Sequence, residues 1–66
     1  MKLPFTEEQW KAAHKAGITD ENYLEEDILD GIVAILESCV YLKMAYNGDT
    51  GIYQDMLDAV NAMFED

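Results

Sequence analysis

Three residue types in this chain could support catalysis: a histidine, a cysteine and many carboxylates. His14 is the only histidine and Cys39 the only cysteine, and nothing in their spacing indicates a catalytic dyad. His14 lies between Lys11 and Lys15 in an alanine-rich segment, which is typical of a surface residue. Cys39 lies in the most apolar part of the chain, whereas a reactive thiol needs an electropositive and partly exposed setting. We therefore expect a buried, unreactive thiol and predict that the chain is not an enzyme.

The run from Asn47 to Gly51 contains oxygen-bearing side chains of the kind found in calcium-binding loops. It lacks the alternating acidic residues before a glycine and the glutamate at the twelfth position that such a loop requires. A turn followed by a helix N-cap at Asp49 or Thr50 explains all five residues. Metal binding through cysteine or histidine clusters is excluded by their number, so we expect no metal and no cofactor.

The carboxylates are the strongest chemical feature of the sequence. There are 14 Asp and Glu residues against four Lys and no Arg, which gives a net charge of −10. Such a surface repels phosphate groups, so we expect no direct binding to nucleic acid and none to an anionic membrane. It attracts a basic protein surface instead, in an association that weakens with salt. We interpret the acidic surface as a protein-binding surface.

Several acidic residues share one line of a predicted second helix and lie among tyrosines, which are favoured at protein interfaces. None of them has a basic residue four positions away that would form a stabilising pair. The predicted partner-binding residues are Tyr23, Glu26, Asp27, Asp30 and Glu37, followed by Asp55 and Asp58.

The elements that must position these residues are helices. The chain has 66 residues, half of them apolar, which predicts a single small all-α domain over residues 1–66. Thr6 with Gln9 forms a capping box, and Phe5 with Trp10 a hydrophobic staple, at the start of a short helix that ends before Gly17. The three predicted helices span about residues 7–16, 20–46 and 51–65, and the last is clearly amphipathic.

The predicted second helix is long and highly apolar, so we expect it to be the central helix that the others cover. Gly31 leaves open whether this helix is continuous. Its apolar residues form two seams, which suit the middle helix of a three-helix bundle or, equally, a homodimer that buries one seam against its copy. One seam consists of Leu29, Ile32, Leu36, Cys39, Lys43 and Tyr46. The other, the predicted helix-packing or dimer seam, consists of Leu24, Ile28, Gly31, Ile35, Ser38, Leu42 and Ala45.

The amino terminus lacks the apolar core of a signal peptide, and the segment 32–46 is too short to span a bilayer. With one cysteine and no internal disulfide, these features predict a cytoplasmic protein. Because the sequence begins with Met and contains no tag or linker, we expect it to be a complete small reading frame.

In size, charge and predicted helicity the chain resembles the small acidic proteins that phages and mobile elements encode against host nucleases, including anti-CRISPR proteins and DNA mimics. This resemblance implies an inhibitor whose carboxylates replace phosphates in the basic groove of a nucleic-acid-binding enzyme. The alternative is a homodimeric structural or regulatory adaptor that acts through an apolar helix interface, with the acidic residues serving solubility.

Overall fold

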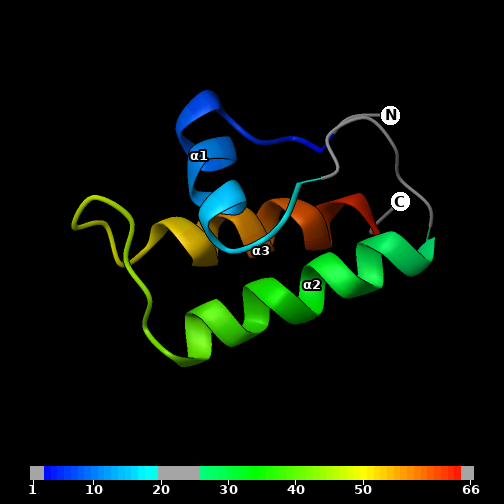
Figure 1. Cartoon of the computed structure of the whole chain (residues 1–66). Coiled ribbons are helices and arrows are strands. Elements are labelled where there is room, and N and C mark those ends of the chain that lie inside the picture. The colour runs from blue at the N-terminus through cyan, green and yellow to red at the C-terminus, as the bar shows by residue number, and fades with distance from the viewer. Residues whose placement is uncertain (1–2, 20–25, 65–66) are drawn as a thin grey trace.

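The computed structural model describes residues 3–19 and 26–64, without the side chains of Glu26 and Asp27. Three helices form this part of the chain: α1 (Glu7–Lys15), α2 (Glu26–Tyr41) and α3 (Ile52–Met63) (Figure 1). The described residues form no β-strand and contain only an isolated bridge between Tyr46 and Asp49. The prediction of an all-α fold with three helices is therefore confirmed.

The boundaries of α1 follow from local signals. The Thr6 side chain accepts a hydrogen bond from the backbone N–H of Gln9, whose own side chain accepts one from the N–H of Thr6. The rings of Phe5 and Trp10 meet edge to face, with centroids 5.1 Å apart, as the predicted staple requires. At the other end Gly17 has a positive φ of 96°, and the chain then turns back so that the following isoleucine is buried. Both predicted ends of this helix are confirmed to within one residue.

The predicted end of the second helix at residue 46 is wrong, because α2 ends at Tyr41. Lys43 adopts a left-handed conformation with φ of 54°. Its N–H donates to the carbonyl of Val40, and the N–H of Met44 donates to that of Cys39, both at 3.0 Å. This is the Schellman arrangement that normally places glycine at the left-handed position. The predicted start at residue 20 lies outside the described residues, and the 16-residue α2 does not confirm a long, highly apolar helix.

The segment 42–51, which connects α2 to α3, contains a tight turn. Tyr46 and Asp49 exchange two backbone hydrogen bonds of 3.0 Å, and Asn47 and Gly48 between them have φ values of 51° and 81°. Positive φ at both central residues defines the type I′ turn that Asn-Gly favours. The turn was predicted, whereas the predicted N-cap is wrong. Gly51 caps α3, and the Asp49 carboxylate accepts a 2.8 Å hydrogen bond from its N–H.

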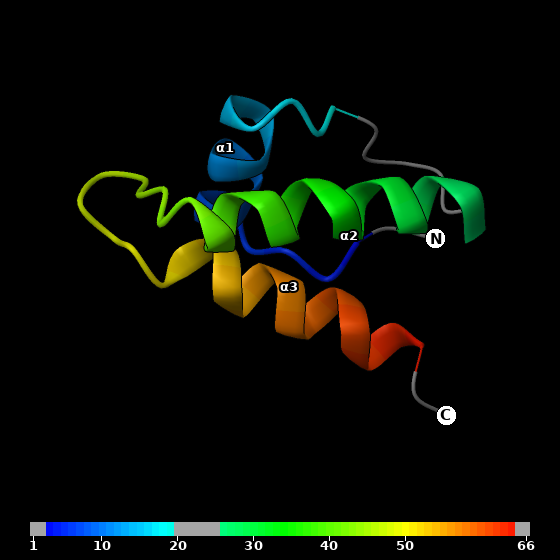
Figure 2. The same ribbon diagram turned by 90° about the horizontal axis from the view of Figure 1, so that it is seen from below.

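The helix contacted by both others is α3, and not the second helix as we expected. α2 and α3 run antiparallel to each other, and α1 lies across the first turns of α3 (Figures 1 and 2). Within the described residues the backbones of α1 and α2 do not approach each other closely. α3 can serve two neighbours because its buried stripe is broad, consisting of Ile52, Tyr53, Met56, Leu57 and Val60.

The core joins the three helices around this stripe. α1 contributes two alanines that are fully buried, which lets α3 approach it closely. The buried hydroxyl of Tyr53 donates a 3.1 Å hydrogen bond to the carbonyl of Ala12 and so ties α3 to α1. α2 contributes part of one predicted seam, because Lys43 and Tyr46 of that seam lie beyond the end of the helix and Lys43 is exposed. Outside α3, the buried residues in the described part of the chain are Leu3, Ala12, Ala13, Ile18, Ile32, Leu36 and Cys39.

Gly31 lies inside α2, and the helix is continuous at that residue. A Cβ atom at Gly31 would meet nothing within 4 Å. Gly31→Ala is therefore expected to raise the free energy of unfolding by about 1 kcal/mol, because alanine loses less backbone entropy in a helix. Urea denaturation measures this change. The matched control is Ala34→Gly at another exposed position of α2, which should lower stability by a similar amount; a less stable Gly31→Ala variant would contradict the open space at this site.

Candidate protein-binding surface

The histidine and the cysteine lie in different environments. His14 is exposed on α1, with its ring centroid 5.9 Å from that of Trp10. Cys39 is buried on α2 and faces the core. Because α1 and α2 do not contact each other closely in the described part of the chain, the two residues are not arranged as a nucleophile and its base.

Burial also changes the acidity of two core groups. It raises the pKa of the Cys39 thiol above its ordinary value of 9.0, against a smaller opposing effect of a backbone hydrogen bond. Burial likewise raises the pKa of Tyr53 above 10.0, and negative charge on Cys39 and then Tyr46 would raise it further. A raised pKa keeps the thiol protonated, and a protonated thiol is a poor nucleophile and metal ligand. Cys39 is thus a small hydrophobic core residue, as predicted.

These pKa shifts predict a loss of stability in alkali. In the unfolded chain the thiol and the phenol lose their protons near pH 9 and 10, before the same groups do so in the folded protein. The unfolded state then binds fewer protons, so the free energy of unfolding falls as the pH rises above about 9. Denaturant titrations at pH 7, 9 and 10.5 measure this fall, which should be shallower in Cys39→Ala and Tyr53→Phe. An unchanged pH dependence in both variants would contradict the assignment to these groups.

The acidic residues chosen from the sequence lie on two helices. Asp30 and Glu37 are exposed on the same side of α2, because seven residues make almost two full turns. Asp55 and Asp58 are exposed on α3, where Asp58 accepts a 3.0 Å hydrogen bond from the Gln54 amide. Tyr23 lies outside the described residues, as do the side chains of Glu26 and Asp27, whose backbone begins α2.

The positive charges do not neutralise these four carboxylates. The one ion pair among the described residues joins Lys11 to Glu8 on α1, at 4.0 Å between exposed side chains. Lys15 lies over the Tyr46 ring, with its Nζ atom 5.7 Å from the centroid. The described surfaces of α2 and α3 therefore carry carboxylates without a salt bridge to a cation of this chain.

The predicted helix-packing or dimer seam is mostly uncovered. Gly31, Ser38 and Leu42 are exposed, and Ile28 and Ile35 are half-buried beside the core. Ala45 lies beyond the end of α2, and Leu24 lies outside the described residues. Neither α1 nor α3 covers the exposed members of this seam, because α3 packs against the opposite seam of α2.

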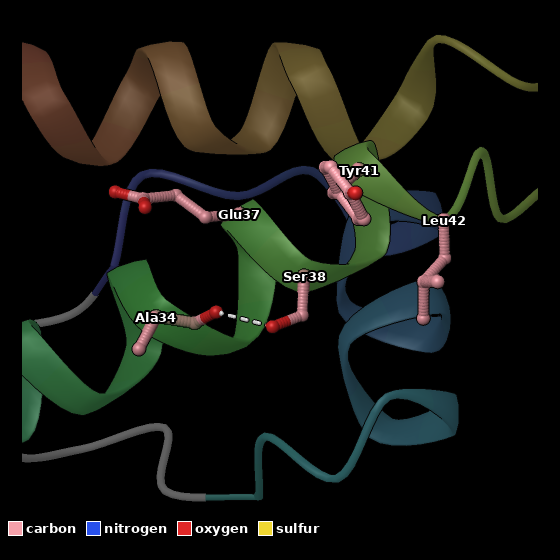
Figure 3. Close-up of a pocket in the computed structure, with 5 residues that line it drawn as sticks. All are labelled: Ala34, Glu37, Ser38, Tyr41 and Leu42. Atoms are coloured by element: carbon pink, nitrogen blue, oxygen red, sulfur yellow. Dashed lines mark hydrogen bonds between the residues drawn. The ribbon is translucent and has the colours of Figure 1, made fainter.

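The exposed surface includes a residue that the sequence-based choice omitted. Tyr41 is 85% exposed and Leu42 is 67% exposed at the end of α2. With Ala34, Glu37 and Ser38 they line an open depression of about 650 Å³ (Figure 3). Four of these five residues belong to α2, and Leu42 directly follows it. Tyr41 lies three or four residues from both Glu37 and Ser38, so helical spacing could have placed it with the acidic line.

Two further features of the described residues bear on function. No group of three or more His, Cys, Asp and Glu side chains among them is arranged to hold a metal ion. No helix in this part of the chain is long and apolar enough to cross a lipid bilayer.

Comparison with known proteins gives a partial similarity to an enzyme. The chain is 39% identical over 54 residues to a cysteine--tRNA ligase of Thermotoga petrophila, and equally to one of Thermotoga sp. strain RQ2. The match covers 79% of this chain but only 12% of each ligase. No protein-family model matches the chain, and no solved structure matches it significantly.

Proposed function

We propose that this chain is a small acidic inhibitor that binds a protein and blocks its basic nucleic-acid-binding groove. The observation that carries the proposal is the excess of exposed carboxylates, at a net charge of −10, over the cations available to pair with them. Asp30 and Glu37 on α2 and Asp55 and Asp58 on α3 are the described residues to which we assign binding. The proposal gives the chain a binding role and no catalytic step.

The physical basis is competition for the same cationic side chains. A groove that binds nucleic acid presents Lys and Arg to phosphates, and a carboxylate on a rigid helix can accept the same charge-assisted hydrogen bonds. Unpaired carboxylates repel one another within the folded chain, and a basic partner relieves that repulsion. Inhibitors of the DNA-mimic type, including anti-CRISPR proteins of that type encoded by phages or mobile elements, act in this way. We place the chain in that functional class.

The partial similarity to cysteine--tRNA ligases suggests one particular nucleic acid to test. Those relatives are named for tRNA, and a net charge of −10 disfavours direct contact between this chain and tRNA. Under the proposal, a basic groove that binds tRNA is therefore a candidate target alongside a groove that binds DNA.

Affinity capture tests this proposal. The immobilised chain is exposed at low salt to a nuclease-treated bacterial lysate, and bound proteins are challenged with duplex DNA or with tRNA. We expect a nucleic-acid-binding protein to be captured and then released by either duplex DNA or tRNA. As a control, an unrelated helical protein of equal net charge should not capture it. A target that stays bound in the presence of both nucleic acids would contradict the proposal.

A second candidate is the homodimeric adaptor, and the exposure of Gly31, Ser38 and Leu42 favours it. A second copy could cover this seam, because small residues let two helices approach closely. Sedimentation velocity would then detect a dimer that Gly31→Leu converts to a monomer. A monomer at all accessible concentrations would exclude this candidate.

A further inference from the structure

We propose that the outer face of α2 binds a basic amphipathic helix of the partner protein. The outer face of α2 means the exposed residues of that helix together with Leu42, which directly follows it: Asp30, Gly31, Ala34, Glu37, Ser38, Tyr41 and Leu42. The inference rests on the proposed function and specifies where the partner binds and which chemistry it presents.

The apolar end of this face would anchor the partner. Tyr41 and Leu42 are more exposed than any other large hydrophobic residue in the described chain, and they lie side by side in sequence at the end of the helix. The depression of about 650 Å³ that they line with Ala34 and Glu37 is open on the solvent side (Figure 3). An apolar side chain of the partner placed there removes both residues from water, and buried aromatic anchors of this kind dominate the energy of many interfaces.

The middle of the face allows a second helix to approach closely. Gly31, Ala34 and Ser38 have small side chains and follow one another at helical spacing. The Ser38 hydroxyl already donates a 3.1 Å hydrogen bond to the carbonyl of Ala34, so a partner can cover it without leaving its donor unsatisfied. A helix axis can therefore come within the 8–10 Å or so that packed helices require.

The charges on the face select a basic partner over a second copy. Asp30 and Glu37 lie about 10 Å apart along the helix, given a rise of about 1.5 Å per residue. The last turn of α2 contains no basic residue. A second copy packed on this face would bring another pair of carboxylates and another net charge of −10 close to the first. Lys or Arg side chains on a partner helix, also seven residues apart, would instead meet both carboxylates.

Nuclear magnetic resonance titration of the isotope-labelled chain tests this inference with two synthetic helical peptides. The first carries Lys at a spacing of seven with leucines between, and the second has the same charge with serines in place of the leucines. We expect the leucine peptide to bind at least about tenfold more tightly, a difference of about 1.4 kcal/mol. Its amide shifts should concentrate in α2 between Asp30 and Leu42.

Matched variants then test whether Tyr41 and Leu42 bind the peptide specifically, or whether any exposed apolar side chain contributes equally. Tyr41→Ala with Leu42→Ala is expected to reduce affinity for the leucine peptide about tenfold or more. Phe64→Ala removes another exposed aromatic side chain, 47% exposed after α3, and should leave affinity unchanged.

The outcomes distinguish this inference from the function on which it rests. Equal affinity for the two peptides, with shifts spread over the acidic residues of all helices, would overturn the α2 site but leave the attraction to basic surfaces intact. Failure of both peptides to bind at low salt would contradict both proposals. Self-association that Leu42→Ala abolishes would overturn the basic helix in favour of a second copy.

Discussion

Leu36→Ala is expected to lower the free energy of unfolding by about 3 kcal/mol, because the change removes buried methyl groups and leaves a cavity. Leu36 is fully buried where α2 packs against α3, and it is one of the four largest side chains with no appreciable exposure among the described residues. A domain of this size has a total stability of roughly 3–10 kcal/mol, so the variant should lose between about a third and all of it. Thermal denaturation followed by circular dichroism measures this loss.

The matched control is Leu42→Ala, which makes the same chemical change on an exposed residue just beyond the end of α2. It should alter stability by no more than about 0.5 kcal/mol. Equal effects of the two variants would contradict the assignment of one seam of α2 to the core and of the other to the surface.

Reversing the charge of Asp30 and Glu37 to lysine is expected to weaken binding to the captured partner about 100-fold at low salt. Each reversal replaces an attraction to a partner cation with a repulsion, and together they correspond to about 2.8 kcal/mol. Both side chains are exposed on α2, so the helix content should stay the same. Isothermal titration calorimetry measures the affinity, and circular dichroism checks the fold.

The same reversal of Asp55 and Asp58 on α3, the second pair to which we assign binding, compares the two helices at an equal change of net charge. A larger loss for the α2 pair supports a localised site on that helix. Equal losses would contradict a site confined to α2, and unchanged affinity in both variants would contradict binding through these carboxylates.

The parts of the fold that could be predicted depend on short-range interactions. The capping box of Thr6 and Gln9 and the contact of Phe5 with Trp10 involve residues three to five positions apart, so their sequence spacing determines them. The same holds for the Asn47–Gly48 turn, whose residue types tolerate positive φ. Helical periodicity was enough to identify the three helices and the buried face of α3.

The errors concern α2 and its role in the core. Nothing in the sequence marks Lys43 as the left-handed residue that ends the helix, since glycine or asparagine normally occupies that position. An apolar run that continues to Tyr46 therefore extended the predicted helix past its end at Tyr41. Which helix lies between the others depends on tertiary packing. Two fully buried alanines on α1 allow this helix to pack closely on α3. Because α1 does not pack on α2, one seam of α2 stays uncovered.

The sequence could predict that the acidic residues of the candidate surface are exposed, because charged side chains are rarely buried. Asp30, Glu37, Asp55 and Asp58 are exposed, as is expected of carboxylates without a salt bridge on amphipathic helices. Their division between two helices was predictable too, and helical spacing places Tyr41 beside Glu37. The exposure of Leu42 was not predictable. Leu42 belonged to the predicted packing seam, and it is exposed because α3 packs against the opposite seam of α2.

The central claim is that this chain and nucleic acid compete for one basic groove, and a competition measurement on the captured partner tests it most directly. Binding of labelled DNA or tRNA to that partner is recorded at increasing concentrations of the chain. The account predicts that the apparent Kd for the nucleic acid rises linearly with the concentration of the chain, while the maximal binding stays constant. The variant with both Asp30→Lys and Glu37→Lys should lose this effect. A complex that contains the partner, the chain and the nucleic acid together would contradict the claim.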